Sequence, residues 1–522
     1  MGNNYVLAMY DIRGKQEFIF RNNSIKEIVG GSAIIRDCWK DYLYPNAEKV
    51  NGNAEICIEE NKKSKGIYHE KTEFSADEFI KRMNGEEYIG ELVYDGGGNF
   101  LVLFKNVEIY KQVTFLMTEQ ILKEIGTLRV LGSYIEDVDL DDYKKDSQRL
   151  YEEHRKREAK CSSSIPWGTL PFVQVDANTS QPLVAIKKYN DGSEKKLSQE
   201  SVAKLNKYEK ELEEHADTIG ETLLDEIVEE KGVDSHLAII YIDGNSMGSK
   251  VENICKDNSK DNSKYDARIK NLRDFSQLIQ KEYIDERIAE IDNYFGDNGK
   301  RRVVIGAGDE INLICKAADA FEITKLYFDG LTENNSNQTS CAGISIFRSH
   351  MPYSDAYKIA EECCESGKKR MKELEIQNAC YIDFHYNQGA IGRELDSIRE
   401  HEYIRGTSRP WLYWIDELEK NKIKEEVLVS QVKEVQGLLN KFSRTNVKGL
   451  MEPAKKGFIY LDIELRRMIA HLKEDKDEVN MLYKQINNSF NDDKEKFAKI
   501  VYDIVLMYDL WFVGNDKENV NR

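Results

Sequence analysis

Residues 301–315 read RRVVIGAGDEINLIC, and the rest of the chain can be interpreted around them. Two apolar runs rich in β-branched residues flank the tip GAGDE, which predicts a β-hairpin. Small residues such as Gly308 let a ligand approach the backbone closely. The adjacent carboxylates of Asp309 and Glu310 repel each other unless a cation lies between them. Oxygen ligands completed by phosphates suit Mg²⁺, although a solvated acidic turn would give the same pattern.

A second motif lies upstream, where residues 236–250 read HLAIIYIDGNSMGSK. The apolar run 237–242 predicts a buried strand that ends at Asp243. Strand ends and helix N-termini are where sheet proteins bind phosphates and metals. We therefore expect backbone amides of the turn into the next helix to cradle a triphosphate; these residues are Gly244, Asn245, Ser246, Met247 and Gly248. One acid at a strand end and two on a hairpin are typical of a palm-type nucleotidyltransferase, with Asp243, Asp309 and Glu310 as catalytic residues and ligands of Mg²⁺ or Mn²⁺.

Three stretches resemble the Cas10/Cmr2 (Csm1-like) family, the large subunit of type III CRISPR complexes. DGNSMG at 243–248 resembles that family's DGDxMG motif. AGDE at 307–310 resembles its GGDD motif and the related motif of GGDEF nucleotide cyclases. Residues 341–370 resemble the strand and helix that end in Ala-Lys, which places Lys368 on the lysine that contacts the substrate triphosphate. The alternative for Lys368 is a lysine that complements a helix C-terminus.

The motifs depart from the family pattern in three places. Asn245 replaces the second Asp, Glu310 replaces an Asp, and Ala307 replaces a tip glycine. These changes lower the ligand charge, lengthen one side chain and narrow the tip by a methyl group. We expect the site to remain active.

Composition limits the classes of function. The chain has 522 residues and a net charge of -18, whereas a free-standing nucleic-acid-binding protein is usually basic. Nine cysteines without a C-x-x-C pair predict reduced thiols and a cytoplasmic protein. Neither a membrane span nor a signal peptide is expected.

The predicted fold class is α/β (α+β), with two ferredoxin-like palm domains, a helical insert and a C-terminal helical domain. The expected domains are 1–137 (a degenerate first palm), 138–232 (a charged helical linker in the place of the family's zinc ribbon), 233–395 (the catalytic palm) and 396–522 (helical). Only Cys161 remains in the linker's ribbon region, so zinc is not expected.

The first palm has a hairpin of its own at 91–104, with the tip DGGGN. Asn99 and Phe100 are expected in the positions of Asp309 and Glu310, so metal chemistry is not expected there. Gly97 and Gly98 would leave room for a nucleotide, or would only allow a tight turn. Gly30-Gly31-Ser32 is expected to begin a helix.

The resemblance implies an enzyme that makes cyclic oligonucleotides, with cyclic oligoadenylate from ATP as the product, in antiviral defence. CRISPR subunits and guide or target RNA are the implied partners, and the family's HD nuclease motif is absent from the sequence. Two alternatives stay open. One is a catalytically weak scaffold or nucleotide-binding subunit, and the other is a GTP-using cyclase. The R-x4-H spacing of Arg466 and His471 also occurs in HEPN ribonucleases, but one such pair arises easily by chance.

Overall fold

A computed structural model describes residues 4–22, 24–52, 66–69, 73–96, 98–161, 172–176, 179–188, 194–214, 227, 236–256, 264–296, 301–333, 338–348, 351–387, 394–402, 406–423, 425–473, 475–491 and 493–512. The chain forms two compact units. The first comprises Met1–Leu223, Ser246–Asp285 and Val304–Asp309. The second comprises Leu224–Asn245, Glu286–Val303 and Glu310–Arg522.

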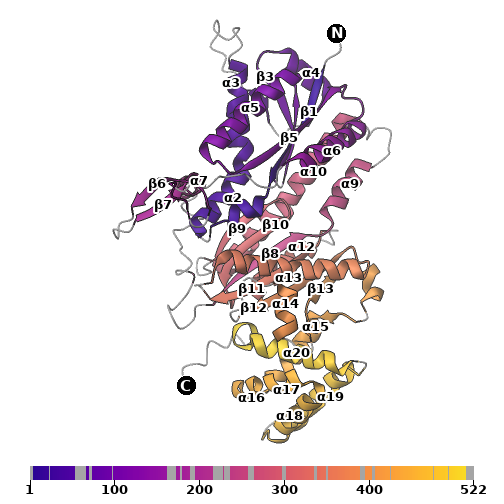
Figure 1. Ribbon diagram of the computed structural model, residues 1–522. Helices are drawn as coiled ribbons and strands as arrows, with labels where there is room; N and C mark the ends of the chain where they lie inside the picture. The colour runs from indigo at the N-terminus through magenta and orange to yellow at the C-terminus, as the bar shows by residue number, and fades with distance from the viewer. Residues whose placement is uncertain are drawn as a thin grey trace. The chain divides into compact units, whose positions relative to one another are not determined.

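The first unit contains a five-stranded sheet in the order β2-β3-β4-β1-β5 (Figure 1). Strand β1 pairs antiparallel with both β4 and β5, and β3 pairs antiparallel with β4. Without the short edge strand β2, this is the strand order of a ferredoxin-like βαββαβ unit. The strands are β1 (Tyr5–Arg13), β2 (Gly66–Tyr68), β3 (Tyr88–Gly96), β4 (Asn99–Phe104) and β5 (Arg129–Val138).

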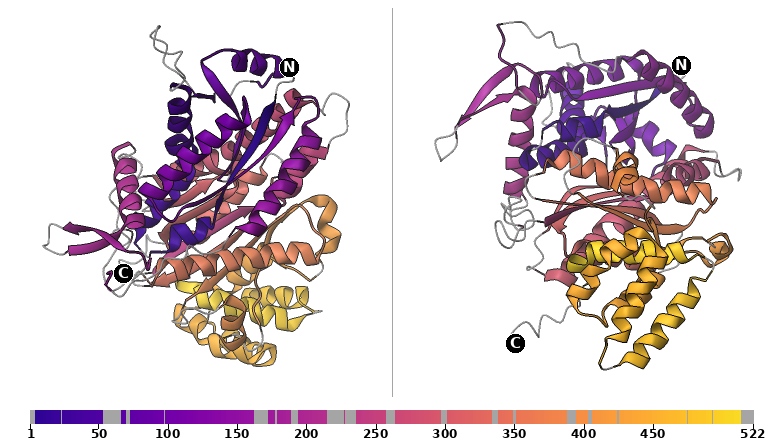
Figure 2. Two further views of the ribbon diagram at one scale, coloured as in Figure 1. Left: turned by 45° about the horizontal axis from the view of Figure 1, so that its top comes forward. Right: turned by 60° about the horizontal axis from the view of Figure 1, so that its bottom comes forward.

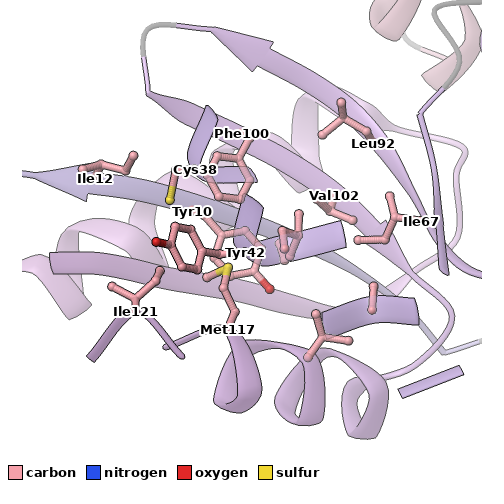
Figure 3. Packing of buried hydrophobic residues seen from close by; sticks show 14 of the residues in the cluster. Tyr10, Ile12, Cys38, Tyr42, Ile67, Leu92, Phe100, Val102, Met117 and Ile121 are labelled. Atoms are coloured by element: carbon pink, nitrogen blue, oxygen red, sulfur yellow. The ribbon is translucent and has the colours of Figure 1, made fainter. Parts of the chain in front are cut away.

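Both faces of this sheet are covered by helices. Strand β1 is accordingly apolar and buried at nearly every position. On one face Tyr10 stacks on Phe100, with ring centroids 5.0 Å apart, beneath helices α2, α3 and α5 (Figure 3). The opposite face is covered by α4, α6 and α10. These helices are α2 (Ile25–Cys38), α3 (Tyr44–Gly52), α4 (Ala76–Asn84), α5 (Val107–Glu124), α6 (Tyr143–Lys160) and α10 (Tyr265–Ile279).

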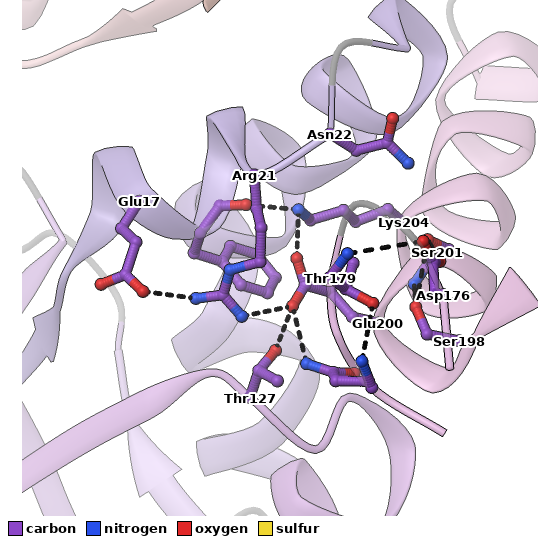
Figure 4. Close-up of polar contacts among 12 residues, drawn as sticks. Glu17, Arg21, Asn22, Thr127, Asp176, Thr179, Ser198, Glu200, Ser201 and Lys204 are labelled. Atoms are coloured by element: carbon purple, nitrogen blue, oxygen red, sulfur yellow. Dashed lines mark hydrogen bonds and ion pairs between the residues drawn. The ribbon is translucent and has the colours of Figure 1, made fainter. Parts of the chain in front are cut away.

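Glycines 30 and 31 lie in the middle of α2, so the prediction that they begin a helix is wrong. A Cβ on Gly30 would lie 1.9 Å from the carbonyl oxygen of Lys204 in α7 (Gln199–Glu214). The glycines therefore serve close helix packing. Glu200 of α7 strengthens this contact, because it accepts hydrogen bonds from Arg21 (2.9 Å) and Thr127 (2.6 Å) while pairing with Lys204 (2.6 Å) (Figure 4). Within 138–232 the described residues also form α6 and the hairpin of β6 (Leu183–Lys188) and β7 (Glu194–Ser198).

The second sheet has seven strands in the order β14-β13-β12-β11-β8-β10-β9. Its strands β11, β8, β10 and β9 repeat the ferredoxin-like order of the first sheet, so the predicted pair of palm sheets is confirmed. The strands are β8 (His236–Gly244), β9 (Arg301–Ala307), β10 (Glu310–Lys316), β11 (Ser340–Arg348) and β12 (Ala379–Tyr386), followed by β13 (Trp411–Ile415) and β14 (Val427–Leu428).

Helices cover both faces of the second unit's sheet. Figure 2 (right) shows the orange helix α13 on one side and the yellow C-terminal helices on the other. On the second side, Trp511 contacts the ring of Phe384, and Phe321 of α12 stacks on Trp511. The remaining elements that join the strands are α1 (Lys15–Phe20), α9 (Met247–Lys256), the π-helical turn Gln280–Asp285, α11 (Glu286–Phe295), α12 (Ala320–Thr332), α13 (Tyr353–Glu373) and α14 (Leu395–Glu402).

The C-terminal region is helical from residue 429, as predicted, but it begins with two strands that were not predicted. Trp411 lies in β13, fully buried beside β12. Tyr460, in contrast, is exposed. The helices are α15 (Val429–Leu439), α16 (Arg444–Gly449), α17 (Met451–Lys456), α18 (Phe458–Ala470), α19 (Lys476–Ser489) and α20 (Lys494–Met507).

Buried ion pairs connect these C-terminal helices to the second sheet. Arg399 of α14 binds Asp383 of β12 through two nitrogens, at 2.7 and 2.9 Å. Arg409 pairs with Asp503 of α20 at 3.1 Å and contacts the carbonyl of Phe384. Burial alone would raise the pKa of Asp383, but the charge of Arg399 outweighs it and the pKa is lowered. No described helix has the length and apolar character needed to cross a membrane.

Candidate active site

Asp243 lies near the end of β8, the strand between β10 and β11. Its Cα is in register with Glu310 of β10 on one side and with Cys341 of β11 on the other. Residues directly opposite each other in antiparallel strands project from the same face. The second unit therefore brings two of the three predicted acids together on the face that α13 covers.

Lys368 of α13 reaches this pair. Its Nζ donates a hydrogen bond to Oδ2 of Asp243 in an ion pair whose side chains are 24% and 23% exposed. Burial alone would lower the pKa of Lys368, but the charge of Asp243 outweighs it, so the pKa is raised and the lysine stays charged. The predicted site lysine thus lies at the predicted strand-end acid.

Two glycines allow α13 to lie close enough for this contact. A Cβ on Gly343 of β11 would lie 1.9 Å from the carbonyl oxygen of Ala360. A Cβ on Gly367 would lie 2.9 Å from Cβ of Tyr381 and 3.2 Å from Sγ of Cys341. Any larger residue would push α13 away from the sheet. The glycines therefore set the distance between Lys368 and Asp243.

Glu310 has a different partner on the same helix. The hydroxyl of Tyr357 donates a hydrogen bond to Oε1 of Glu310 at 3.4 Å. Tyr241 meets Tyr357 edge to face, with centroids 5.5 Å apart. Burial, followed by the charge of Glu310, raises the pKa of Tyr241, so this hydroxyl stays protonated. Neither Tyr241 nor Tyr357 was predicted as a site residue from the sequence. The available signal was that Tyr357 shares one face of the predicted helix with Tyr353, one turn earlier.

The loop after Asp243 is fixed by Asn245, which is buried. Its side-chain nitrogen donates hydrogen bonds to Oγ1 of Thr339 at 3.0 Å and to the carbonyl of Ala379 at 2.8 Å. Its backbone amide donates to the carbonyl of Thr339 at 2.8 Å. Asn245 therefore holds the start of this loop against the neighbouring strands, and Gly244 beside it is buried.

The other predicted site residues belong to the first unit. Ser246 adopts a left-handed φ of 59°, and Met247 begins α9. A Cβ on Gly248 would meet nothing within 4 Å, so the helix start has open space there. Gly308, with φ 65°, and the partly exposed Asp309 form the turn between β9 and β10.

The hairpin of the first sheet corrects one alignment. Gly96 pairs with Asn99, so two residues separate the paired ends of β3 and β4. Two residues also separate the end of β9 at Ala307 from the start of β10 at Glu310. Asn99 therefore corresponds to Glu310 rather than to Asp309. Its partner across the ladder is Asp11 of β1, just as Glu310 faces Asp243.

The first sheet neutralises its strand-end acid internally. Asp11 is buried and pairs with Arg13 at 2.9 Å and with His154 at 3.6 Å. Gly98 has a φ of 78°, and a Cβ there would lie 2.7 Å from Cε of Lys15. The Lys15 side chain thus occupies the space next to Gly98, and Gly97 lies outside the described residues.

The carboxylates of the second unit suit the metal that the resemblance implies. Mg²⁺ is usually held by one or two carboxylates together with substrate phosphates, and Asp243 and Glu310 provide two on one face. Among the described residues no group of three or more His, Cys, Asp and Glu is arranged to hold a metal. Burial raises the pKa of Cys341 to about 12, so this neighbouring thiol stays protonated and is a poor ligand. The site would therefore depend on substrate phosphates to complete the coordination.

Comparison with known proteins finds similar folds but no sequence family. No family model and no curated protein matches the sequence. The crystal structure of the Csm1–Csm4 cassette in complex with cA4 is 14% identical, covers 97% of this chain and 70% of that chain, and has a TM-score of 0.48. The crystal structure of the Csm1–Csm4 subcomplex of the type III-A CRISPR-Csm interference complex is 13% identical, covers 97% of this chain and 70% of that chain, and has a TM-score of 0.48. Csm1 in T. onnurineus is 14% identical, covers 97% of this chain and 69% of that chain, and has a TM-score of 0.46. Csm1 is the Cas10 protein of type III CRISPR-Csm complexes, which is the family that the sequence motifs resemble.

Proposed function

We propose that the chain is a Mg²⁺-dependent nucleotidyltransferase that makes cyclic oligoadenylate from ATP. The observation that carries the proposal is the register of Asp243 and Glu310 on one face of a ferredoxin-like sheet. These two residues come from the two motifs that resemble the Cas10/Cmr2 family, and the fold brings them together from distant parts of the sequence.

The proposed reaction joins nucleotides through phosphorus. A ribose hydroxyl of one nucleotide attacks the α-phosphorus of another and releases its proton to solvent, a new P–O bond forms, and the bond to pyrophosphate breaks. Asp243 and Glu310, with Asp309 next to Glu310 in the chain, supply the oxygen ligands for the metal. When bound, Mg²⁺ neutralises phosphate charge and lowers the pKa of the attacking hydroxyl. The protein contributes positioning and charge, because phosphoryl transfer requires little covalent help.

Other residues bind the triphosphate. Lys368 brings a positive charge to the edge of the acid pair, where it can contact the phosphates. Tyr357 orients Glu310 through its hydroxyl.

Two observations favour the alternative function, nucleotide binding without turnover. Lys368 already neutralises Asp243, and Asn245 stands where the resembled family has a further acid. A site with this lower negative charge would bind metal more weakly and could act as a sensor or scaffold.

Turnover assays distinguish these functions. The purified chain is incubated with Mg²⁺ and either ATP or GTP, with and without guide and target RNA and partner subunits. Pyrophosphate release and mass spectrometry of the product give the base and the ring size. We expect a cyclic adenylate product. Nucleotide binding without product under every condition would instead establish the scaffold.

A pair of double variants tests the site. Asp309→Ala with Glu310→Ala should abolish the product and leave the fold intact. The matched control is Asp477→Ala with Glu478→Ala, which removes an adjacent and exposed Asp-Glu pair from the first turn of α19. Equal rates in the two double variants would show that the hairpin acids are not the site.

A further inference from the structure

The ion pair between Lys368 and Asp243 has a consequence for metal binding. Oδ2 of Asp243 is the atom that accepts the hydrogen bond from Lys368, and it is also an oxygen that a divalent cation would need. An ammonium and a divalent cation at one carboxylate oxygen repel each other strongly in a partly buried site. The two cations therefore compete for Asp243 unless further negative charge is present.

The surroundings allow the lysine to move but hold its helix in place. Gly343 and Gly367 bring the backbone of α13 into contact with β11 and β12, and buried Cys341 and Cys364 pack at the same position. A dense contact of this kind resists small shifts of the helix. The flexible four-carbon stem of Lys368 can rotate instead, so exchange of the cation requires only a change of one side chain.

We propose that Lys368 neutralises Asp243 in place of the metal until a nucleoside triphosphate binds. The negative charges of the triphosphate draw Lys368 away from Asp243, and the divalent cation then takes its place. The inference rests on the proposed function only in its assignment of Asp243 as a metal ligand. Metal and triphosphate must then bind cooperatively, and each must raise the affinity for the other by the same factor.

The first test measures Mn²⁺ binding by electron paramagnetic resonance without nucleotide. Lys368→Met removes the competing charge and should tighten the site by about tenfold, within the range typical of such couplings. Lys368→Arg keeps the charge and should bind Mn²⁺ as weakly as the wild type. Adding Asp243→Asn to Lys368→Met should abolish the gain, which assigns the gain to this carboxylate. The matched control is Lys369→Met, because Lys369 is the next residue in α13 and is exposed.

The second test uses the unaltered chain and α,β-methylene ATP, which lacks the scissile P–O bond. The analogue should tighten Mn²⁺ binding in the wild type by about tenfold and should tighten it less in Lys368→Met. Equal Mn²⁺ affinities for wild type and Lys368→Met, in a site that Asp243→Asn removes, would overturn the inference. Cooperative binding without any turnover of ATP would uphold the inference and contradict the proposed enzyme.

Discussion

Glu310 lies directly opposite Asp243 across the ladder between β10 and β8, and both project from the face beneath α13. The same register in the first sheet pairs Asp11 with Asn99. The second sheet thus has two carboxylates at this position, while the first sheet has one, which forms an ion pair with Arg13. The difference predicts that metal binding belongs to the second sheet.

Glu310→Gln should lower the rate of product formation by about a hundredfold or more, the scale for losing one stabilising group at an active site. The amide keeps the size of the side chain but removes the charge that a divalent cation requires. Pyrophosphate release at saturating ATP measures the effect. Glu478→Gln, at an exposed position of α19, is the control and should keep the wild-type rate. A Glu310→Gln variant with that same rate would exclude Glu310 as a ligand.

Tyr357→Phe should weaken binding of Mn²⁺ with α,β-methylene ATP by about tenfold, the lower end of effects seen when the hydrogen-bond partner of a metal ligand is lost. The phenyl ring retains the contact with Tyr241, and the hydrogen bond from the hydroxyl to Glu310 is lost. Tyr353→Phe, one turn earlier in α13, removes a hydroxyl that donates to Asn312 at 2.6 Å. That control should lower the melting temperature without changing Mn²⁺ affinity. If both variants bind Mn²⁺ equally, Tyr357 does not position Glu310.

The sequence predicted the parts of the site that local pattern determines. The apolar run that ends at Asp243 predicted a strand, and the small-residue tip before Glu310 predicted a hairpin; the structure has both elements. The partner of Lys368 could not be predicted, because it depends on how closely α13 approaches the sheet. Strand β13 was missed because WLYWI has no polar alternation and is too short to separate strand from helix. Asn99 was misplaced by one residue because the turn length, and not the glycines, sets the register.

Gly343→Ala should destabilise the second unit by about 1–3 kcal/mol or more, the usual cost of overpacking a dense contact. The added methyl group would clash with the carbonyl of Ala360 and push α13, with Lys368, away from Asp243. Tryptophan fluorescence during denaturation reports on this unit through Trp411. Gly437→Ala is the control, because Gly437 is at an exposed position of α15 and a Cβ there would meet nothing within 4 Å. It should stabilise the chain by about 0.5–1 kcal/mol. A neutral Gly343→Ala would show that α13 is not held this closely.

His385 of β12 should make the second unit less stable in mild acid. Burial, followed by the charges of Arg409 and Arg399, lowers the pKa of this imidazole from an ordinary 6.5 to about 3. Between pH 6.5 and about pH 3, the imidazole is therefore protonated in the unfolded chain and neutral in the folded chain. The free energy of unfolding falls as the pH drops below 6.5. The stability is complete above this pH range. Within the range, the free energy of unfolding falls by about 1.4 kcal/mol for each pH unit.

Denaturant titrations at pH 7.5 and pH 5 should therefore differ by about 2 kcal/mol more in the wild type than in His385→Asn, because asparagine does not titrate. His401→Asn is the control, because it makes the same exchange at an exposed position of α14. The comparison is between slopes with pH, so a general loss of stability in His385→Asn does not affect it. Parallel pH profiles for the wild type and His385→Asn would mean that the imidazole is protonated equally in the folded and unfolded chains.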